Sequence, residues 1–142
     1  MKKFTSESEI NYLKKNGMSC IGKGAYSQVR LIKHKNSPTG PFALKKMKLL
    51  DPREKKYIDR EIKLHQKLKH PFIIELHDHF YENDHAFIIL EYATHGNLYH
   101  YLYKTLYIPE DDLLEIFVQV VMAVEYLHQN DILHRDIKPE NI

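Results

Sequence analysis

The chain has 142 residues, of which 43% are hydrophobic and 28% charged, a balance typical of a globular domain with enough apolar side chains for a core. With 21 basic and 19 acidic residues the net charge is only +2, and no apolar run is long enough to cross a bilayer, so the composition gives no support to binding of nucleic acid or membrane. A single cysteine, Cys20, excludes an intrachain disulfide and no signal peptide is recognisable, so we expect a soluble protein of the cytoplasm or nucleus.

The first third of the chain is expected to form strands. Residues 1–16 are polar and show no clear periodicity, so we interpret them as a lead-in. Strands are expected at 18–21 and 26–32, joined by a turn that contains two glycines. A third strand is expected at 42–49, after the turn-forming sequence Asn-Ser-Pro-Thr-Gly.

A helix is expected to follow the third strand. Asp51 can cap it, Pro52 suits its first position, and Glu54 can complete a capping box. The residues that share one face of this helix by their spacing are Ile58, Glu61, His65 and Leu68. A glutamate on an inward face requires a partner, because burying an unpaired carboxylate costs free energy.

The second half of the chain is expected to be partly strand and then helical. Two further strands are predicted at 73–81 and 86–92, a short helix at 97–104 and a long helix at 109–129. The long helix opens with acidic residues, which suit a helix N-terminus. It is apolar over a wide arc, so we expect it to be buried on most sides. This order of elements predicts an α+β domain followed by a helical part.

The turn around Gly22 and Gly24 can bring backbone N–H groups close to a phosphate, because glycine lets the backbone approach a ligand. A dinucleotide-binding turn would have a third glycine where Ser27 stands and a helix straight afterwards, whereas a strand is expected here. A Walker-type loop would have serine or threonine after its Gly-Lys pair, whereas Gly24 follows Lys23. A glycine turn between two strands remains, and by itself it fits a simple hairpin equally well.

A lysine on the third strand favours a functional turn. Ala43 and Lys45 are two residues apart and therefore share a face of the strand. Glu61 lies on the inward stripe of the next helix, and Lys45 is its obvious candidate partner. Alone, Lys45 would be interpreted as a solvated surface lysine. A lysine–glutamate pair behind a glycine turn instead indicates a site that orients phosphate.

The final sequence, His-Arg-Asp-Ile-Lys-Pro-Glu-Asn-Ile at 134–142, completes a set of four motifs. A glycine turn, a strand lysine, a helix glutamate and this loop occur in the order typical of the eukaryotic protein kinase family, which the chain resembles over nearly its whole length. Because Lys138 stands two residues after Asp136, the loop resembles that of the serine/threonine branch. Residues 60–99 look similar to Aurora- or Polo-like kinases.

The resemblance implies a division of the chain into three parts. Residues 1–16 would be an N-terminal extension, and 17–93 an ATP-binding lobe with a five-stranded antiparallel sheet and one regulatory helix. Residues 94–142 would be an incomplete helical lobe that ends in the catalytic loop. The implied ligands are ATP and Mg²⁺, and the implied substrate is a protein with serine or threonine hydroxyls.

The resemblance also implies residues for ATP. Lys45 would hold the α- and β-phosphates and Glu61 would orient Lys45, while Val29 and Ala43 would enclose the adenine. The full implied ATP-binding set is Ile21, Gly22, Gly24, Val29, Ala43, Lys45, Glu91 and Ala93.

In the catalytic loop the resemblance implies three roles. Asp136 would orient the substrate hydroxyl and accept its proton, Lys138 would neutralise charge on the transferred phosphoryl group, and Asn141 would ligate Mg²⁺. An aspartate of ordinary pKa is a weak base, so the main contribution expected of Asp136 is positioning.

Four features depart from the family pattern, and the first is Ser27, which replaces a loop glycine. Asn97 stands where many relatives carry an acid that binds ribose or a basic substrate, and His65 is polar at an internal hydrophobic position. The Asp-Phe-Gly motif that the family places after Asn141 does not occur in these 142 residues. We therefore expect the isolated chain to be inactive. The alternative is a non-catalytic interaction module that binds nucleotide weakly or not at all, with a protein partner covering its exposed helices.

Overall fold

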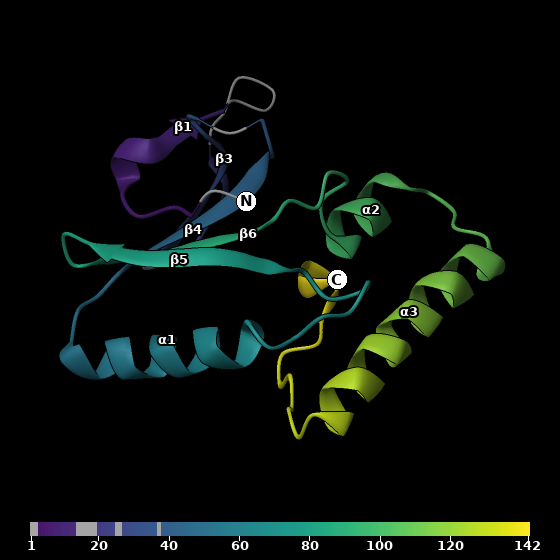
Figure 1. The fold of residues 1–142 in the computed structure, drawn as a ribbon. Coiled ribbons are helices and arrows are strands. Elements are labelled where there is room, and N and C mark those ends of the chain that lie inside the picture. The colour runs from purple at the N-terminus through teal and green to yellow at the C-terminus, as the bar shows by residue number, and fades with distance from the viewer. Residues whose placement is uncertain (1–2, 14–19, 25–26, 37) are drawn as a thin grey trace. The chain divides into compact units, whose positions relative to one another are not determined.

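The computed structural model describes residues 3–13, 20–24, 27–36 and 38–142, and the chain divides into two compact units (Figure 1). The first unit comprises the chain up to Lys69 together with Ile74–Tyr92. The second comprises His70–Ile73 and Ala93–Ile142. The first unit contains a sheet and one α-helix, and the second is helical.

Within the described residues of the first unit, six strands form one antiparallel sheet. Their order is β1-β3-β4-β6-β5, and β2 pairs with the part of β3 that β1 leaves free. The strands are β1 Ile10–Tyr12, β2 Cys20–Lys23, β3 Ser27–His34, β4 Phe42–Lys48, β5 Leu76–Glu82 and β6 His85–Glu91. The expected antiparallel sheet with one α-helix is confirmed, with one strand more than expected.

The predicted strands occur in the predicted order, with shifted ends. The strand expected from residue 73 begins only at Leu76, because the backbone N–H of Ile73 donates to His70 O at 3.1 Å and closes a turn there. Of the first two predicted strands, residues 18, 19 and 26 lie outside the described part of the chain.

The additional strand, β1, comes from the segment that was interpreted as a lead-in. Phe4 and Ile10 are 2% and 4% exposed, and a short 3₁₀ turn, η1 (Glu7–Glu9), lies between them. The backbone N–H of Phe4 donates to the buried carboxylate of Asp78 at 2.7 Å. The sequence did not reveal this segment, because two widely spaced apolar residues show no period.

Both faces of the sheet are covered. The face that we call the N-terminal face packs under Phe4 and Ile10, and its buried residues are Ile32, Phe42, Leu44, Phe80, Phe87 and Ile89. The opposite face, here the helix face, packs under Ile58 and Ile62 of α1 (Pro52–His65), and its buried residues include Leu76, Ala86 and Ile88. Figure 1 shows α1 running along the sheet below β5. Each buried aliphatic side chain contributes about 1.5–3 kcal/mol to folding.

Helix α1 begins where the sequence predicted. The Asp51 carboxylate accepts a hydrogen bond from the Arg53 backbone N–H at 2.7 Å, which caps the first turn. The expected capping box is displaced by one residue, since Glu54 accepts from the N–H of Leu50 at 2.7 Å and not from that of Asp51. Glu54 therefore ties the helix start to the preceding loop.

The second unit contains α2 (Leu98–Lys104), α3 (Glu110–Gln129) and the 3₁₀ turn η2 (Pro139–Asn141). The expectation that α3 is buried on most sides is wrong, because Leu127 is its sole buried residue in the described chain. The large apolar side chains of α3 that are exposed include Leu113, Leu114, Phe117, Val118, Val121 and Met122. None of the described helices is long and apolar enough to cross a membrane.

Candidate functional site

The glycine turn lies between β2 and β3 of the first unit. The backbone N–H of Gly24 donates to Ser27 O at 2.8 Å, which closes the turn, and residues 25 and 26 lie outside the described chain. A Cβ atom on Gly24 would lie 2.9 Å from Ser27 Oγ, and one on Gly22 would lie 3.4 Å from Val29 Cβ. Both glycines therefore keep the backbone surface open at positions where a side chain would fill the space.

The strand register aligns several of the predicted ATP residues. Gly22 lies opposite Val29, and Val29 lies opposite Lys45, so the three form a row across β2, β3 and β4. Ala43 is buried and pairs with Leu90 of β6. Directly opposed residues share a face of a sheet. The open glycine backbone, an aliphatic surface and an amino group thus lie on the helix face.

The predicted ion pair between Lys45 and Glu61 is not formed. Among the ion pairs of the described residues none involves either side chain, and Glu61 is exposed. The buried stripe of α1 is centred on Ile58 and Ile62, which leaves Glu61 at its flank. An inward orientation was predicted for Glu61 because it follows Ile58 by three residues and so lies on the same side of the helix. Since Glu61 is exposed to solvent, it does not need a buried counterion.

The other polar residue of that predicted stripe, His65, has a partner. Its Nε2 lies 2.7 Å from Ile74 O, within the first unit. This contact joins the last turn of α1 to the residues that lead into β5. The hydrogen bond explains how a polar residue is accommodated at this position.

The two residues predicted to contact adenine through their backbones belong to different units. The N–H of Glu91, at the end of β6, donates to Glu75 O at 2.8 Å, which leaves the Glu91 carbonyl as the group for a ligand. Ala93 is exposed in the second unit, and its carbonyl accepts from Gly96 N at 3.3 Å. Gly96 has a φ of 85°, a conformation that favours glycine.

Of the residues predicted to be catalytic or to bind metal, those of the loop, Asp136, Lys138 and Asn141, meet in the second unit, whereas Lys45 and Glu61 belong to the first. Lys138 Nζ lies 2.9 Å from Asp136 Oδ1, and Asn141 Nδ2 donates to Asp136 Oδ2 at 2.9 Å and to Asp136 O at 2.8 Å. The hydrogen bond from Lys138, and then that from Asn141, lower the pKa of Asp136 below its usual value. The carboxylate is therefore ionised at neutral pH and held in one orientation, although all three residues are exposed.

Local backbone geometry shapes this loop. Arg135 has a φ of 66°, in the left-handed region that non-glycine residues seldom adopt. The N–H of Asp136 donates to the Nδ1 atom of His134 at 3.3 Å. A residue held in this region costs of order 1–3 kcal/mol and persists only where surrounding contacts enforce it.

Sequence reasoning missed the part played by Asn97. Its Oδ1 accepts from the His100 N–H at 3.0 Å and caps α2, while its Nδ2 donates to Glu140 O at 3.2 Å. A second link runs from the N–H of Leu98 to Ile142 O at 2.7 Å. The start of α2 thus holds the end of the catalytic loop. The N-cap position was predictable from the sequence, but the contact with Glu140 was not.

The donor chemistry of the loop fits Mg²⁺. Within the described chain, both hydrogen bonds of the Asn141 side chain to Asp136 use its Nδ2, which leaves its Oδ1 as the atom that could ligate an ion. Mg²⁺ prefers oxygen ligands and is commonly held by one or two protein oxygens together with substrate phosphates and water. The described residues contain no group of three His, Cys, Asp or Glu side chains that could hold a metal by themselves.

Comparison with known proteins gives consistent relatives. Residues 16–142 match the family model for the protein kinase domain. The chain is 40% identical over 126 residues to an Aurora kinase of Debaryomyces hansenii. The aligned region covers 86% of this chain and 30% of that protein. It is 35% identical over 126 residues to the human NUAK family SNF1-like kinase 2, covering 88% of this chain and 20% of that protein.

A solved structure agrees with these sequence matches. The crystal structure of Rad53 1-466 in complex with AMP-PNP superposes with a TM-score of 0.79 at 26% identity, covering 94% of this chain and 34% of that chain. The 142 residues thus span about a third or less of each of these three proteins.

Proposed function

The chain belongs to the protein kinase domain family, and on that premise we propose that the protein transfers the γ-phosphate of ATP to serine and threonine hydroxyls of other proteins. The observation that carries the proposal is the Asp136 carboxylate, fixed between Lys138 and Asn141. A carboxylate that is ionised and oriented is what positioning of a hydroxyl nucleophile requires.

ATP is the proposed phosphate donor, bound through residues of the helix face and the glycine turn. The row of Gly22, Val29 and Lys45 offers open backbone, apolar surface and a positive charge in adjacent strands. Lys45 has no ion-pair partner in the described chain, so its ammonium group is free to bind phosphate. The similarity to a structure solved with AMP-PNP supports nucleotide as the ligand class.

The roles proposed for the loop residues follow from their charges. Asp136 would align the substrate hydroxyl and accept its proton as the oxygen attacks the γ-phosphorus. Lys138 would lie close to the transferred phosphoryl group and neutralise its charge, and Asn141 would supply one oxygen to Mg²⁺. When bound, the ion would offset the negative charge of the phosphates.

Two variants separate nucleotide binding from transfer. Lys45→Met is expected to weaken MgATP binding roughly 10- to 100-fold, the effect of losing one charge-assisted hydrogen bond, measured by fluorescent-nucleotide titration. Lys33→Met is the matched control, since Lys33 is an exposed lysine of β3. Asp136→Asn should leave MgATP affinity within about threefold and lower the transfer rate. Equal affinities for wild type, Lys45→Met and Lys33→Met would argue against the proposed ATP site.

One observation favours the second candidate, a non-catalytic interaction module. The exposed apolar side chains of α3 give the second unit a surface of the kind that binds another protein. The 142 residues contain no Asp-Phe-Gly motif, so we expect them alone to transfer little phosphate, and the transfer assay should use the native protein. If the native protein neither binds MgATP nor transfers phosphate, the interaction module is the better proposal.

A further inference from the structure

The side chain of Asn97 uses both ends of its amide group within the second unit. Its Oδ1 accepts from the backbone N–H of His100 at 3.0 Å and lies 2.6 Å from His100 Nδ1, while its Nδ2 donates to Glu140 O at 3.2 Å. Because an amide oxygen accepts and an amide nitrogen donates, this orientation satisfies all three contacts, and His100 Nδ1 carries a hydrogen. Capping of α2 requires only the Oδ1, so the contact made by Nδ2 has another consequence.

The Nδ2 contact reaches the peptide group that leads into Asn141. The carbonyl of that peptide is Glu140 O, and its N–H donates to Lys138 O at 2.8 Å. Since a peptide group is planar, these two bonds fix its orientation. The Asn141 side chain in turn donates to Asp136 Oδ2 at 2.9 Å and to Asp136 O at 2.8 Å. Asn141 is thus held at its backbone by Asn97 and at its side chain by Asp136.

A second bond from the start of α2 lies on the other side of Asn141. Leu98 is the first residue of this helix, and the first N–H groups of a helix have no partner within it. The N–H of Leu98 donates instead to Ile142 O at 2.7 Å. Two consecutive residues, Asn97 and Leu98, therefore bind the carbonyls on either side of Asn141.

These bonds lie where water competes for them. Asn97 and Leu98 are half-buried, whereas Glu140 and Asn141 are exposed. A hydrogen bond that competes with water adds little to the free energy of unfolding, although it still restricts the groups that it joins. We therefore expect the Nδ2 contact to affect the geometry of the loop more than the stability of the fold.

We propose that Asn97 is a positioning residue for phosphate transfer, because its Nδ2 fixes the peptide before Asn141 and with it the Asn141 Oδ1 atom that would ligate Mg²⁺. His100 supports this role, since its backbone N–H and its ring nitrogen both bind Asn97 Oδ1 and so direct Nδ2 toward Glu140. Asn97 acts through Asn141 and is not itself a catalytic residue. The inference rests on the proposed function, which assigns the metal to Asn141.

Asn97→Asp and Asn97→Ser separate the donor from the cap. Aspartate and serine are both good N-cap residues, so each variant keeps an acceptor for the His100 N–H. Neither supplies an amide N–H to Glu140 O, and the serine variant adds no charge. The matched control is Asn130→Asp, because Asn130 Nδ2 makes the same kind of bond, to Tyr126 O at 2.8 Å, at the end of α3.

The first measurement is residue-resolved amide hydrogen exchange of the native protein, which needs neither nucleotide nor activity. The N–H groups of Leu98 and Asn141 should exchange roughly three- to tenfold faster in both Asn97 variants, the effect of losing one hydrogen bond. The N–H of His100 should stay within about twofold of wild type, because the cap is kept. Asn130→Asp should leave the exchange of Leu98 and Asn141 unchanged.

The second measurement is the transfer rate as a function of substrate and Mg²⁺. In both Asn97 variants we expect kcat to fall roughly three- to tenfold, KM for the protein substrate to stay within about twofold, and half-maximal rate to require more Mg²⁺. Asn130→Asp should keep the wild-type kcat and Mg²⁺ dependence. A residue that only stabilises the fold would not shift the Mg²⁺ dependence.

Four results would overturn the proposal. They are unchanged exchange in both Asn97 variants, equally faster exchange of the His100 N–H, an effect of Asn97→Asp that Asn97→Ser lacks, and faster exchange with unchanged kcat and Mg²⁺ dependence. The second would mean fraying of α2, and the third an effect of the added charge. A wild-type protein that transfers no phosphate would refute the proposed function, while hydrogen exchange would still decide whether Asn97 fixes the loop.

Discussion

At the scale of single residues, the loop at 134–142, which is proposed to be catalytic, is organised around one carboxylate with two fixed partners. Asp136 receives hydrogen bonds from Lys138 and Asn141, and Asn141 binds both its carboxylate and its carbonyl. Lys45 and Glu61 differ in this respect, because neither has an ion-pair partner in the described chain. The Asp136 carboxylate is thus oriented by neighbouring side chains, while the predicted lysine–glutamate pair is not formed.

Lys138→Met tests this preorganisation. The hydrogen bond from Lys138 is the larger cause of the lowered Asp136 pKa, so its loss should raise that pKa toward the usual value. The ionised form of Asp136 persists above its pKa and is lost as pH falls through it. The acid limb of the transfer rate should therefore move to higher pH in Lys138→Met. NMR titration of the Asp136 carboxyl carbon checks the shift directly, with Lys104→Met as an exposed control. An unchanged Asp136 titration would contradict the assigned cause.

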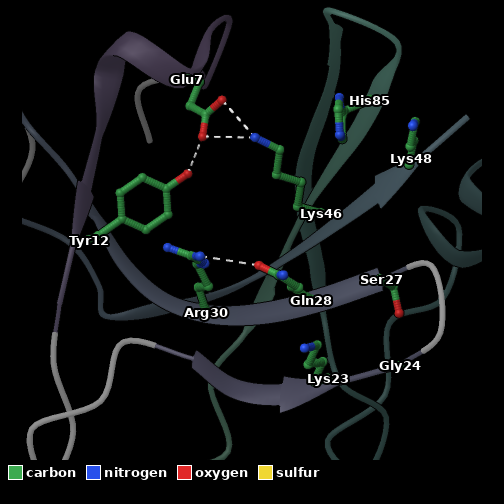
Figure 2. A pocket seen from close by; sticks show the side chains of 10 residues that line it. All are labelled: Glu7, Tyr12, Lys23, Gly24, Ser27, Gln28, Arg30, Lys46, Lys48 and His85. Atoms are coloured by element: carbon green, nitrogen blue, oxygen red, sulfur yellow. Dashed lines mark hydrogen bonds and ion pairs between the residues drawn. The ribbon is translucent and has the colours of Figure 1, made fainter.

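At the scale of elements, two covers stabilise the sheet from opposite sides. Helix α1 buries Ile58 and Ile62 on the helix face, and the N-terminal segment buries Phe4 and Ile10 on the other. A polar residue also lies at the margin of each cover. Glu61 lies exposed on α1, and Glu7 forms an ion pair with Lys46 beside the N-terminal segment (Figure 2).

Ile62→Ala measures the contribution of the α1 cover. Ile62 is 2% exposed, and truncating a buried isoleucine typically costs about 2–5 kcal/mol of unfolding free energy. The control in the same helix is Leu64→Ala, since Leu64 is 39% exposed and should cost less than about 1 kcal/mol. Urea denaturation of both variants gives the comparison. Equal losses would mean that α1 does not pack on the sheet through Ile62.

The same elements show what the sequence could and could not predict. Strands β4 and β6 were predictable because their apolar residues lie between turn signals, and helix α1 was predictable from Asp51 and Pro52 at its start. Asp51 and Asn97 are N-cap residues of standard type. Strand β1 was not predictable, because its pairing with β3 depends on long-range contacts such as that between Phe4 and Asp78. The predicted inward orientation of Glu61 is wrong, because spacing from Ile58 alone does not determine which neighbouring residue faces the sheet.

At the scale of the whole molecule, the four motifs found in the sequence are distributed over two compact units. The glycine turn, Lys45 and Glu61 belong to the first unit, and the catalytic loop belongs to the second. Motif order along the chain indicated the family, and the match of residues 16–142 to the protein kinase domain confirmed it.

The central claim is that the native protein transfers the γ-phosphate of ATP to protein hydroxyls, and that Asp136 positions the hydroxyl for this transfer. The most direct measurement is incubation with MgATP labelled at the γ-phosphate and a mixed protein substrate, followed by phosphoamino-acid analysis, for wild type and Asp136→Asn. We predict label on serine and threonine with wild type, and a rate lower by roughly 10²- to 10⁴-fold with Asp136→Asn. Undiminished transfer by Asp136→Asn, or no transfer by a wild-type protein that binds MgATP, would contradict the claim.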